Sequence, residues 1–264
     1  MRALRARVAS DSVPTVLHDQ LGNKSGARKG LDRLPLARIG VWISTFCLLA
    51  ALGATPAPGQ SLTEDAELRN YAVHINRTPP QTWPGYGIYL GNGLVLTAFH
   101  VPGNFAVTKP HVLIGGQDLA AALVRQGSLE GVDLTLLSID PSKLPVRLQM
   151  RRLPFCKRDP YPSERVIVAI PEGTARSTVL PPSLAPRDLR GRFDTLIGDV
   201  ATTGNSGSGV FDAWQKCLLG VVSRKLTVRV REDRIGDSIR SRDIAKYFVP
   251  IRDIRAFIPA NISF

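Results

Sequence analysis

Gly204-Asn205-Ser206-Gly207-Ser208-Gly209 sets a serine among small residues in a glycine-dense turn near the end of the chain. Such a turn exposes the Ser206 hydroxyl and allows another backbone to approach closely. A serine hydroxyl is a weak nucleophile until a neighbouring base takes its proton. A reactive Ser206 therefore requires a histidine and a carboxylate in fitting contexts elsewhere in the chain. A glycine-rich loop without a chemical role is the competing interpretation.

A histidine in a fitting context follows the apolar stretch Leu94–Thr97. The sequence Thr97-Ala98-Phe99-His100 places an imidazole where a predicted strand gives way to a turn. The chain has four histidines, and the others lack such a setting. Taken alone, a histidine at the end of a strand is also typical of a structural or surface position.

A lone carboxylate opens a later apolar stretch, Gly131-Val132-Asp133-Leu134-Thr135-Leu136-Leu137. Burying a carboxylate is unfavourable unless it is paired or hydrogen-bonded, and an imidazole N–H is a suitable partner. A turn cap at the entrance of a strand is the alternative role for Asp133.

Short apolar runs separated by turns fill the chain from Tyr71 onward and predict strands. Asn92-Gly93, between two of these runs, is a hairpin signal. Apolar residues at 251, 254, 257 and 258 predict a short amphipathic helix over Ile251–Ile258. We expect an all-β fold with a short C-terminal helix, in one unit over residues 61–264. The predicted strands are Val73–Ile75, Gly87–Leu90, Leu94–Thr97, Val107–Ile114, Leu134–Ile139, Val166–Ile170 and Cys217–Val222.

Residues 1–60 are expected to form a leader with a signal segment. Ile39–Ala54 is uncharged and mostly apolar, and it lies between Arg38 and a run of small residues and prolines. A membrane span needs about twenty apolar residues, so the pattern favours an export signal. A retained anchor and a buried helix of a soluble domain are the alternatives. The expected location is exported, periplasmic or secreted, or else at a membrane through residues 39–54.

The net charge of the 264-residue chain is +12, but its basic residues fall mostly in ones and twos. Arg151-Arg152, Lys157-Arg158 and Arg224-Lys225 are examples, and we identify no RNA-binding signature and no extended basic stripe interleaved with aromatic residues. This pattern is typical of a solvated basic surface rather than of a nucleic-acid-binding stripe. We therefore expect no nucleic-acid partner, and a membrane partner only if the apolar leader segment is retained.

Removal of the leader would leave Cys156 and Cys217 as the remaining cysteines. An even pair in an exported protein predicts a disulfide, with two separate buried thiols as the alternative. The chain has no paired Cys/His spacing, so we expect no metal site.

The motifs together resemble those of the trypsin/chymotrypsin-like serine proteases, in particular bacterial members without a following peptide-binding domain. His100, Asp133 and Ser206 occur in the chain order of that family. The resemblance extends from about residue 70 to about residue 260. The matching boxes are Thr97-Ala98-Phe99-His100, Val132 to Leu137, Gly204 to Ser208 and Leu218 to Ser223.

The resemblance implies two six-stranded antiparallel Greek-key barrels with the active site between them. In the implied mechanism Ser206 attacks the scissile carbonyl, His100 moves the proton and Asp133 orients the imidazole. The backbone N–H groups of Gly204 and Ser206 would form the oxyanion hole. The resemblance also implies polypeptide substrates, a monomer and no cofactor.

Three residues bear on specificity and are assigned to substrate binding. Ser223 matches the residue whose carbonyl holds substrate backbone in the family. Arg224 follows it where the family often has tryptophan, and it would either recruit acidic substrate side chains or point away. Asp199, near the expected pocket floor, would favour basic side chains, with a surface turn as its alternative. These cues oppose one another and leave specificity open.

Asn205 departs from the pattern of digestive trypsins, which have an aspartate that pairs with a newly cut N-terminus. We therefore expect no activation of that kind. The expected function is a serine endopeptidase. The alternatives are a catalytically weak or inactive binding protein on a protease fold, and an esterase that uses the same three residues.

Overall fold

A computed structural model of the chain describes residues 65–78, 85–187, 189–198, 206–231 and 239–264, with the backbone alone at 228–231 and 239–242. The predicted leader, Asp199, Gly204 and Asn205 lie outside these residues. In the part of the chain that is described, no helix is long and apolar enough to cross a membrane.

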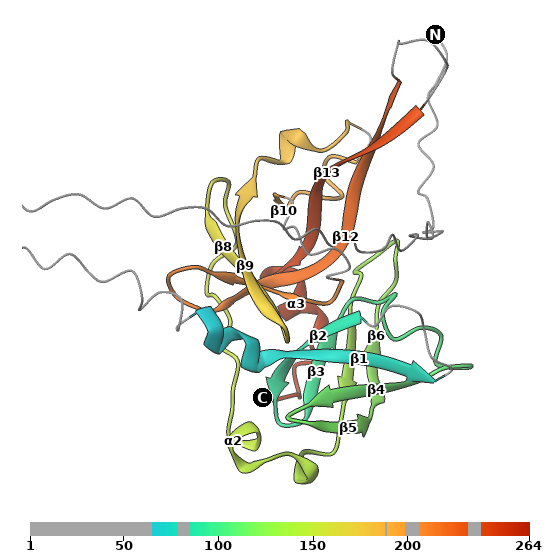
Figure 1. Cartoon of the computed structure of the whole chain (residues 1–264), viewed down its shortest axis with the longest axis vertical. Coiled ribbons are helices and arrows are strands. Elements are labelled where there is room, and N and C mark those ends of the chain that lie inside the picture. Colours follow the sequence, from blue (N-terminus) through green and yellow to red (C-terminus); the bar gives the residue numbers. More distant parts are fainter. Residues whose placement is uncertain (1–64, 79–84, 188, 199–205, 232–238) are drawn as a thin grey trace, which may run out of the picture. The chain divides into compact units, whose positions relative to one another are not determined.

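The N-terminal part of this region folds as an antiparallel sheet of seven strands in the order β5-β4-β1-β2-β3-β7-β6 (Figure 1). Its two edge strands, β5 and β6, follow each other in the chain and are separated by Ala121 alone. They form one bent strand, whose first half pairs with β4 and whose second half pairs with β7. This break is the reason that seven strands occur where six were predicted. The strands are β1 Ala72–Thr78, β2 Gly85–Gly91, β3 Leu94–Thr97, β4 Lys109–Ile114, β5 Gln117–Ala120, β6 Ala122–Gln126 and β7 Thr135–Ser138.

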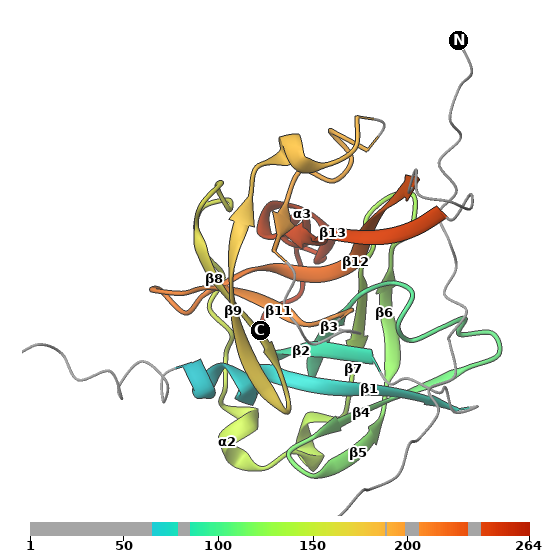
Figure 2. The ribbon, with the colours of Figure 1, turned by 45° about the horizontal axis from the view of Figure 1, so that its top comes forward.

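The C-terminal part forms a closed six-stranded barrel in the order β10-β13-β12-β11-β8-β9, as predicted for the second barrel. Strands β12 and β13 remain paired as far as Arg231 and Ile239, and they continue past the barrel as a two-stranded ribbon (Figures 1 and 2). The strands are β8 Arg165–Ile170, β9 Gly173–Leu180, β10 Leu196–Ile197, β11 Gly209–Asp212, β12 Leu218–Arg231 and β13 Ile239–Pro250.

Helices are short in the described region, which confirms an all-β fold. The predicted C-terminal helix is α3, Ile251–Phe257, and it buries Ile251, Ile254 and Phe257. Other helical pieces are residues 65–67, α2 Val146–Gln149 and the short 3₁₀ helices η1 Leu68–Tyr71, η2 Pro141–Lys143 and η3 Pro182–Leu184.

The predicted hairpin turn joins β2 to β3. Asn92 and Gly93 both have positive φ, at 48° and 75°. This conformation matches the twist of the flanking strands and is accessible to asparagine and glycine at little cost. The turn positions β3, which ends at Thr97, three residues before His100.

Three apolar clusters hold the fold together. One lies within the first sheet and includes Val73, Tyr89 and Leu137. Another lies within the barrel and includes Val210 and both cysteines. The third joins the two halves. It combines Ile88 and Leu96 from the first sheet, Phe211 and Val221 from the barrel, and Ile251 from α3. Burial of this shared surface holds the two halves against each other.

The predicted disulfide is present between Cys156 and Cys217, whose Cα atoms are 5.0 Å apart. It links the segment before β8 to the start of β12, and both cysteines are buried. Next to it, the Cys156 N–H donates to the Leu218 carbonyl at 3.0 Å. The crosslink therefore pins an irregular segment to the barrel wall.

Reduction of this disulfide should lower the free energy of unfolding by about 4 kcal/mol. The crosslink joins residues 61 positions apart in the sequence, and its loss gives the unfolded chain more conformational freedom. Urea unfolding with and without dithiothreitol measures the change. Cys47→Ser is the matched control and should lose as much stability on reduction as the unsubstituted chain. Identical unfolding curves in the two conditions would contradict a structural disulfide.

Candidate active site

Three chain segments bring the predicted site residues to one place. β3 ends at Thr97, and His100 follows in a turn that the Val101 N–H closes onto the Ala98 carbonyl at 3.1 Å. Asp133 lies two residues before β7, and β3 and β7 are neighbours in register. Ser206 lies just before β11 of the barrel. The site therefore sits where the two halves of the fold meet.

His100 and Asp133 form a pair of unequal exposure. The Nδ1 atom of His100 lies 3.3 Å from Oδ1 of Asp133, and the Phe99 N–H donates to the same oxygen at 3.0 Å. The Asp133 side chain is 2% exposed and that of His100 is 37% exposed. The carboxylate thus fixes one edge of a ring whose other edge is accessible.

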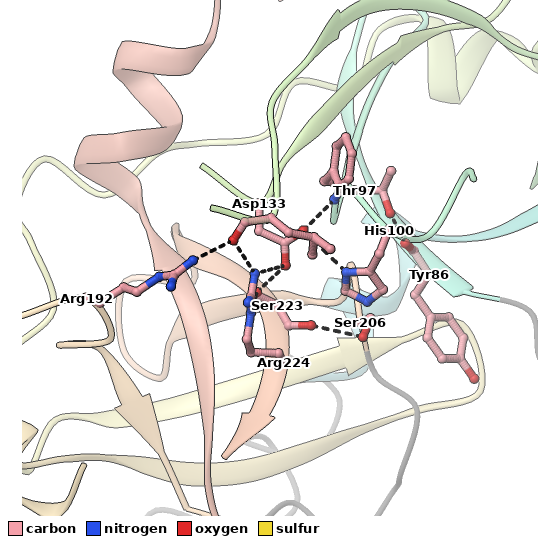
Figure 3. A network of polar contacts seen from close by, with 10 residues as sticks. Tyr86, Thr97, His100, Asp133, Arg192, Ser206, Ser223 and Arg224 are labelled. Atoms are coloured by element: carbon pink, nitrogen blue, oxygen red, sulfur yellow. Dashed lines mark hydrogen bonds and ion pairs between the residues drawn. The ribbon is translucent and has the colours of Figure 1, made fainter. Parts of the chain in front are cut away.

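Ser206 lies beside the other edge of the His100 ring (Figure 3). Its hydroxyl donates a hydrogen bond to the backbone carbonyl of Ser223 at 3.0 Å. The structure gives no hydrogen bond between this hydroxyl and the His100 ring.

The second oxygen of Asp133 faces β12. The Ser223 hydroxyl and an Arg224 guanidinium nitrogen both donate to Oδ2, the latter at 3.2 Å. Burial is the largest influence on the Asp133 carboxyl and raises its pKa. The hydrogen bond and charge of His100, the Ser223 hydroxyl and the Arg224 charge outweigh it and hold that pKa below its usual range. Asp133 is therefore an anion at neutral pH despite its burial.

A β-bulge explains how two consecutive side chains reach one carboxylate. Neighbouring side chains of a regular strand point to opposite faces. The β12–β13 register shifts between Val222 and Arg224 and leaves Ser223 without a ladder partner. The extra residue re-aims the strand, so Ser223 and Arg224 both face Asp133.

A second contact set ties Ser206 to the first sheet. The Tyr86 N–H donates to the Ser206 carbonyl at 3.1 Å, and the Gly207 N–H donates to the Val222 carbonyl at 2.8 Å. The Thr97 hydroxyl donates to the Tyr86 carbonyl at 2.6 Å. Ser206 is thus held by β2 of one half and by β12 of the other.

Sequence reasoning placed some site residues and missed others. His100, Asp133, Ser206, Ser223 and Arg224 lie together. Asp199 and Gly204 fall outside the described residues, so their roles stay predictions. The Arg224–Asp133 contact was missed, because a bulge has no signature in the order of residue types. The neighbouring Lys225 pairs with Asp243 at 2.9 Å, and Thr97 and Tyr86 are further positioning residues that sequence reasoning did not select.

No family model and no curated protein matches the sequence of the chain. Its structure is similar to that of the Rv3671c protease of M. tuberculosis in its inactive form, with 17% identity and a TM-score of 0.51, over 77% of this chain and 96% of that chain. Kallikrein-related peptidase 10 is 18% identical with a TM-score of 0.52, over 71% of this chain and 93% of that chain. Deg5 is 14% identical with a TM-score of 0.51, over 74% of this chain and 90% of that chain.

The chain has the trypsin-like serine protease fold. In this trypsin-like fold the curled sheet carries His100 and Asp133, and the closed barrel carries Ser206. Within the described region, no cluster of three or more His, Cys, Asp or Glu side chains is arranged to hold a metal ion.

Gly207→Ala should be strongly destabilising. Gly207 has φ of +89°, and a Cβ there would collide with the Tyr86 carbonyl oxygen. The strain of a left-handed backbone at a non-glycine residue and the steric overlap together predict that the free energy of unfolding falls by about 3 kcal/mol or more. Urea unfolding measures this change. Gly191→Ala is the matched control, because Gly191 has φ of +82° and open space around it. It should lose only about 1–2 kcal/mol. Equal losses in the two variants would show that the Tyr86–Ser206 junction is not close-packed.

Proposed function

We propose that the chain is an exported serine endopeptidase that hydrolyses peptide bonds through an acyl-enzyme on Ser206. The observation that carries this proposal is the pairing of His100 with a buried, ionised Asp133, beside a serine in the corresponding place of a trypsin-like fold. A buried carboxylate needs a partner, and an imidazole held by it is a prepared base.

In the proposed mechanism His100 takes the hydroxyl proton as Ser206 Oγ attacks the scissile carbonyl carbon. Asp133 holds Nδ1–H, which leaves the other ring nitrogen free to accept the proton, and it stabilises the imidazolium that forms. His100 then delivers the proton to the amine as the C–N bond breaks. Water then loses a proton to His100 and attacks the ester carbonyl carbon. As the bond to Ser206 Oγ breaks, His100 returns the proton to that oxygen, and the carboxylic acid is released.

Charge on the substrate oxygen would be stabilised by the backbone N–H groups of Ser206 and Gly204, the latter outside the described residues. Each such donor contributes about 3–4 kcal/mol in comparable sites. We infer polypeptide substrates, with the Ser223 carbonyl available to substrate backbone when Ser206 turns toward His100. The Cys156–Cys217 disulfide supports an exported location, because disulfides persist in oxidising compartments.

One observation favours the alternative of a weakly active or inactive binding protein. The Ser206 hydroxyl donates to the Ser223 carbonyl rather than to the imidazole. In an inactive protein this hydrogen bond would persist. In an active enzyme the hydroxyl would instead donate to His100 during the reaction.

A fluorophosphonate probe, which phosphonylates activated serines, tests the proposal on the full-length chain. The unsubstituted chain should label, and Ser206→Ala and His100→Ala should lose labelling by at least about a thousandfold, because the nucleophile or its base is removed. Ser208→Ala is the matched control: Ser208 is fully buried, its Oγ has no partner, and its loss should leave labelling unchanged. Failure of the folded, unsubstituted chain to label would favour the binding protein.

A further inference from the structure

We propose that Arg224 is a positioning residue for the His100–Asp133 pair: its guanidinium fixes Asp133 and offsets part of the carboxylate charge, so that His100 stays unprotonated to lower pH. This inference rests on the proposed function, since it concerns the working pH range of the same base.

The Arg224 guanidinium is held at several points in one orientation. One terminal nitrogen lies 3.2 Å from Asp133 Oδ2 and 3.1 Å from the Leu129 carbonyl, and Nε lies 3.3 Å from the Ser223 hydroxyl. The guanidinium carbon also lies 5.2 Å from the centre of the Phe193 ring. The side chain is 21% exposed. A planar fork with these partners is pre-organised in a way that a lysine is not.

This geometry ties the loop before β7 to β12, and Figure 3 shows the Arg224 guanidinium beside Asp133. Arg224 donates to both Leu129 and Asp133, so it connects the two ends of the loop to β12. Arg192 donates to the same Leu129 carbonyl at 3.2 Å, but the structure gives it no contact with Asp133. Arg224 is thus the guanidinium placed to act on the carboxylate itself.

The charge of Arg224 acts on both members of the pair. It favours the ionised carboxylate, and it weakens the negative potential that stabilises a protonated imidazole. The other groups in contact with Asp133 are His100, the Phe99 N–H and the neutral Ser223 hydroxyl, and the charge of Asp133 also acts on Tyr247 of β13. Burial, with the charges of Asp253 and Asp194, raises the pKa of Tyr247 to about 12, so its phenol stays neutral in the working range. Asp133 is thus the charged group in contact with His100, and Arg224 is the cation in contact with that carboxylate.

The sign of the effect follows from this balance. Without Arg224, Asp133 would still be ionised at pH values above the usual pKa range of a carboxyl group. Its charge would no longer be partly offset, so it would hold the proton on His100 more strongly. Protonated His100 cannot act as a base. As the pH falls, activity would therefore be lost at a higher pH without Arg224 than with it. A purely structural role for Arg224 would instead lower the rate by one factor at every pH.

The pH profile of fluorophosphonate labelling on the full-length chain separates these outcomes. Arg224→Gln should move the acid limb upward by about half to one pH unit, the size expected for one partly screened charge. Arg192→Gln is the matched control, since Arg192 shares the Leu129 carbonyl and lies over the same Phe193 ring. Its acid limb should stay in place. An unmoved limb in Arg224→Gln would overturn the inference, even if the rate falls.

Arg224→Lys provides a second test, and it carries the test if Arg224→Gln does not fold. A lysine keeps the charge but not the fork, so the limb should stay near its original position while the maximal rate falls. A limb that moves upward in Arg224→Lys by half a unit or more would overturn the electrostatic role.

Proton NMR titration of the histidine rings distinguishes failure of this inference from failure of the proposed function. The His100 titration midpoint should rise in Arg224→Gln whether or not the chain labels, with His74 and His111 as internal references. A chain that never labels but shows the rise refutes the proposed enzyme and keeps the Arg224 effect. A chain that labels without the rise refutes the Arg224 effect alone.

Discussion

The burial of one carboxylate at the junction of the two halves is the constraint on which the site depends. The Asp133 side chain is 2% exposed, so it requires partners for both oxygens. Those partners come from the turn after β3 and from the bulged part of β12. Because Asp133 draws these segments together, the position of His100 follows from the satisfaction of a buried charge.

The junction is reinforced by backbone contacts that small residues allow. Gly207 gives the barrel segment a left-handed turn against Tyr86, and the Tyr86 N–H holds the Ser206 carbonyl. The apolar cluster shared by the two halves also joins the first sheet to the barrel. The geometry between Ser206 and His100 therefore depends on packing of the whole interface rather than on either half alone.

The fold was predictable where periodicity was strong. Apolar runs such as Leu94–Thr97, the Asn92-Gly93 turn and the amphipathic helix all have a local signature. β6 and β9 were missed because they expose much of their length, and β9 alternates without an apolar run. The long β12–β13 ribbon was missed because its sequence is rich in arginine. Its strands are stabilised by pairing with each other, which periodicity does not record.

The sequence by itself determined the chemistry of the candidate site: a serine in a glycine-dense turn, a histidine after a strand and an aspartate before one. These depend on residue type and on neighbours in the chain, so they could be read locally. Only the tertiary structure decided that Ser223 and Arg224 share Asp133. A β-bulge overrides strand alternation there, and it arises from pairing between segments rather than from the residues within one. The charge environment of the His100–Asp133 pair was therefore a property of the fold.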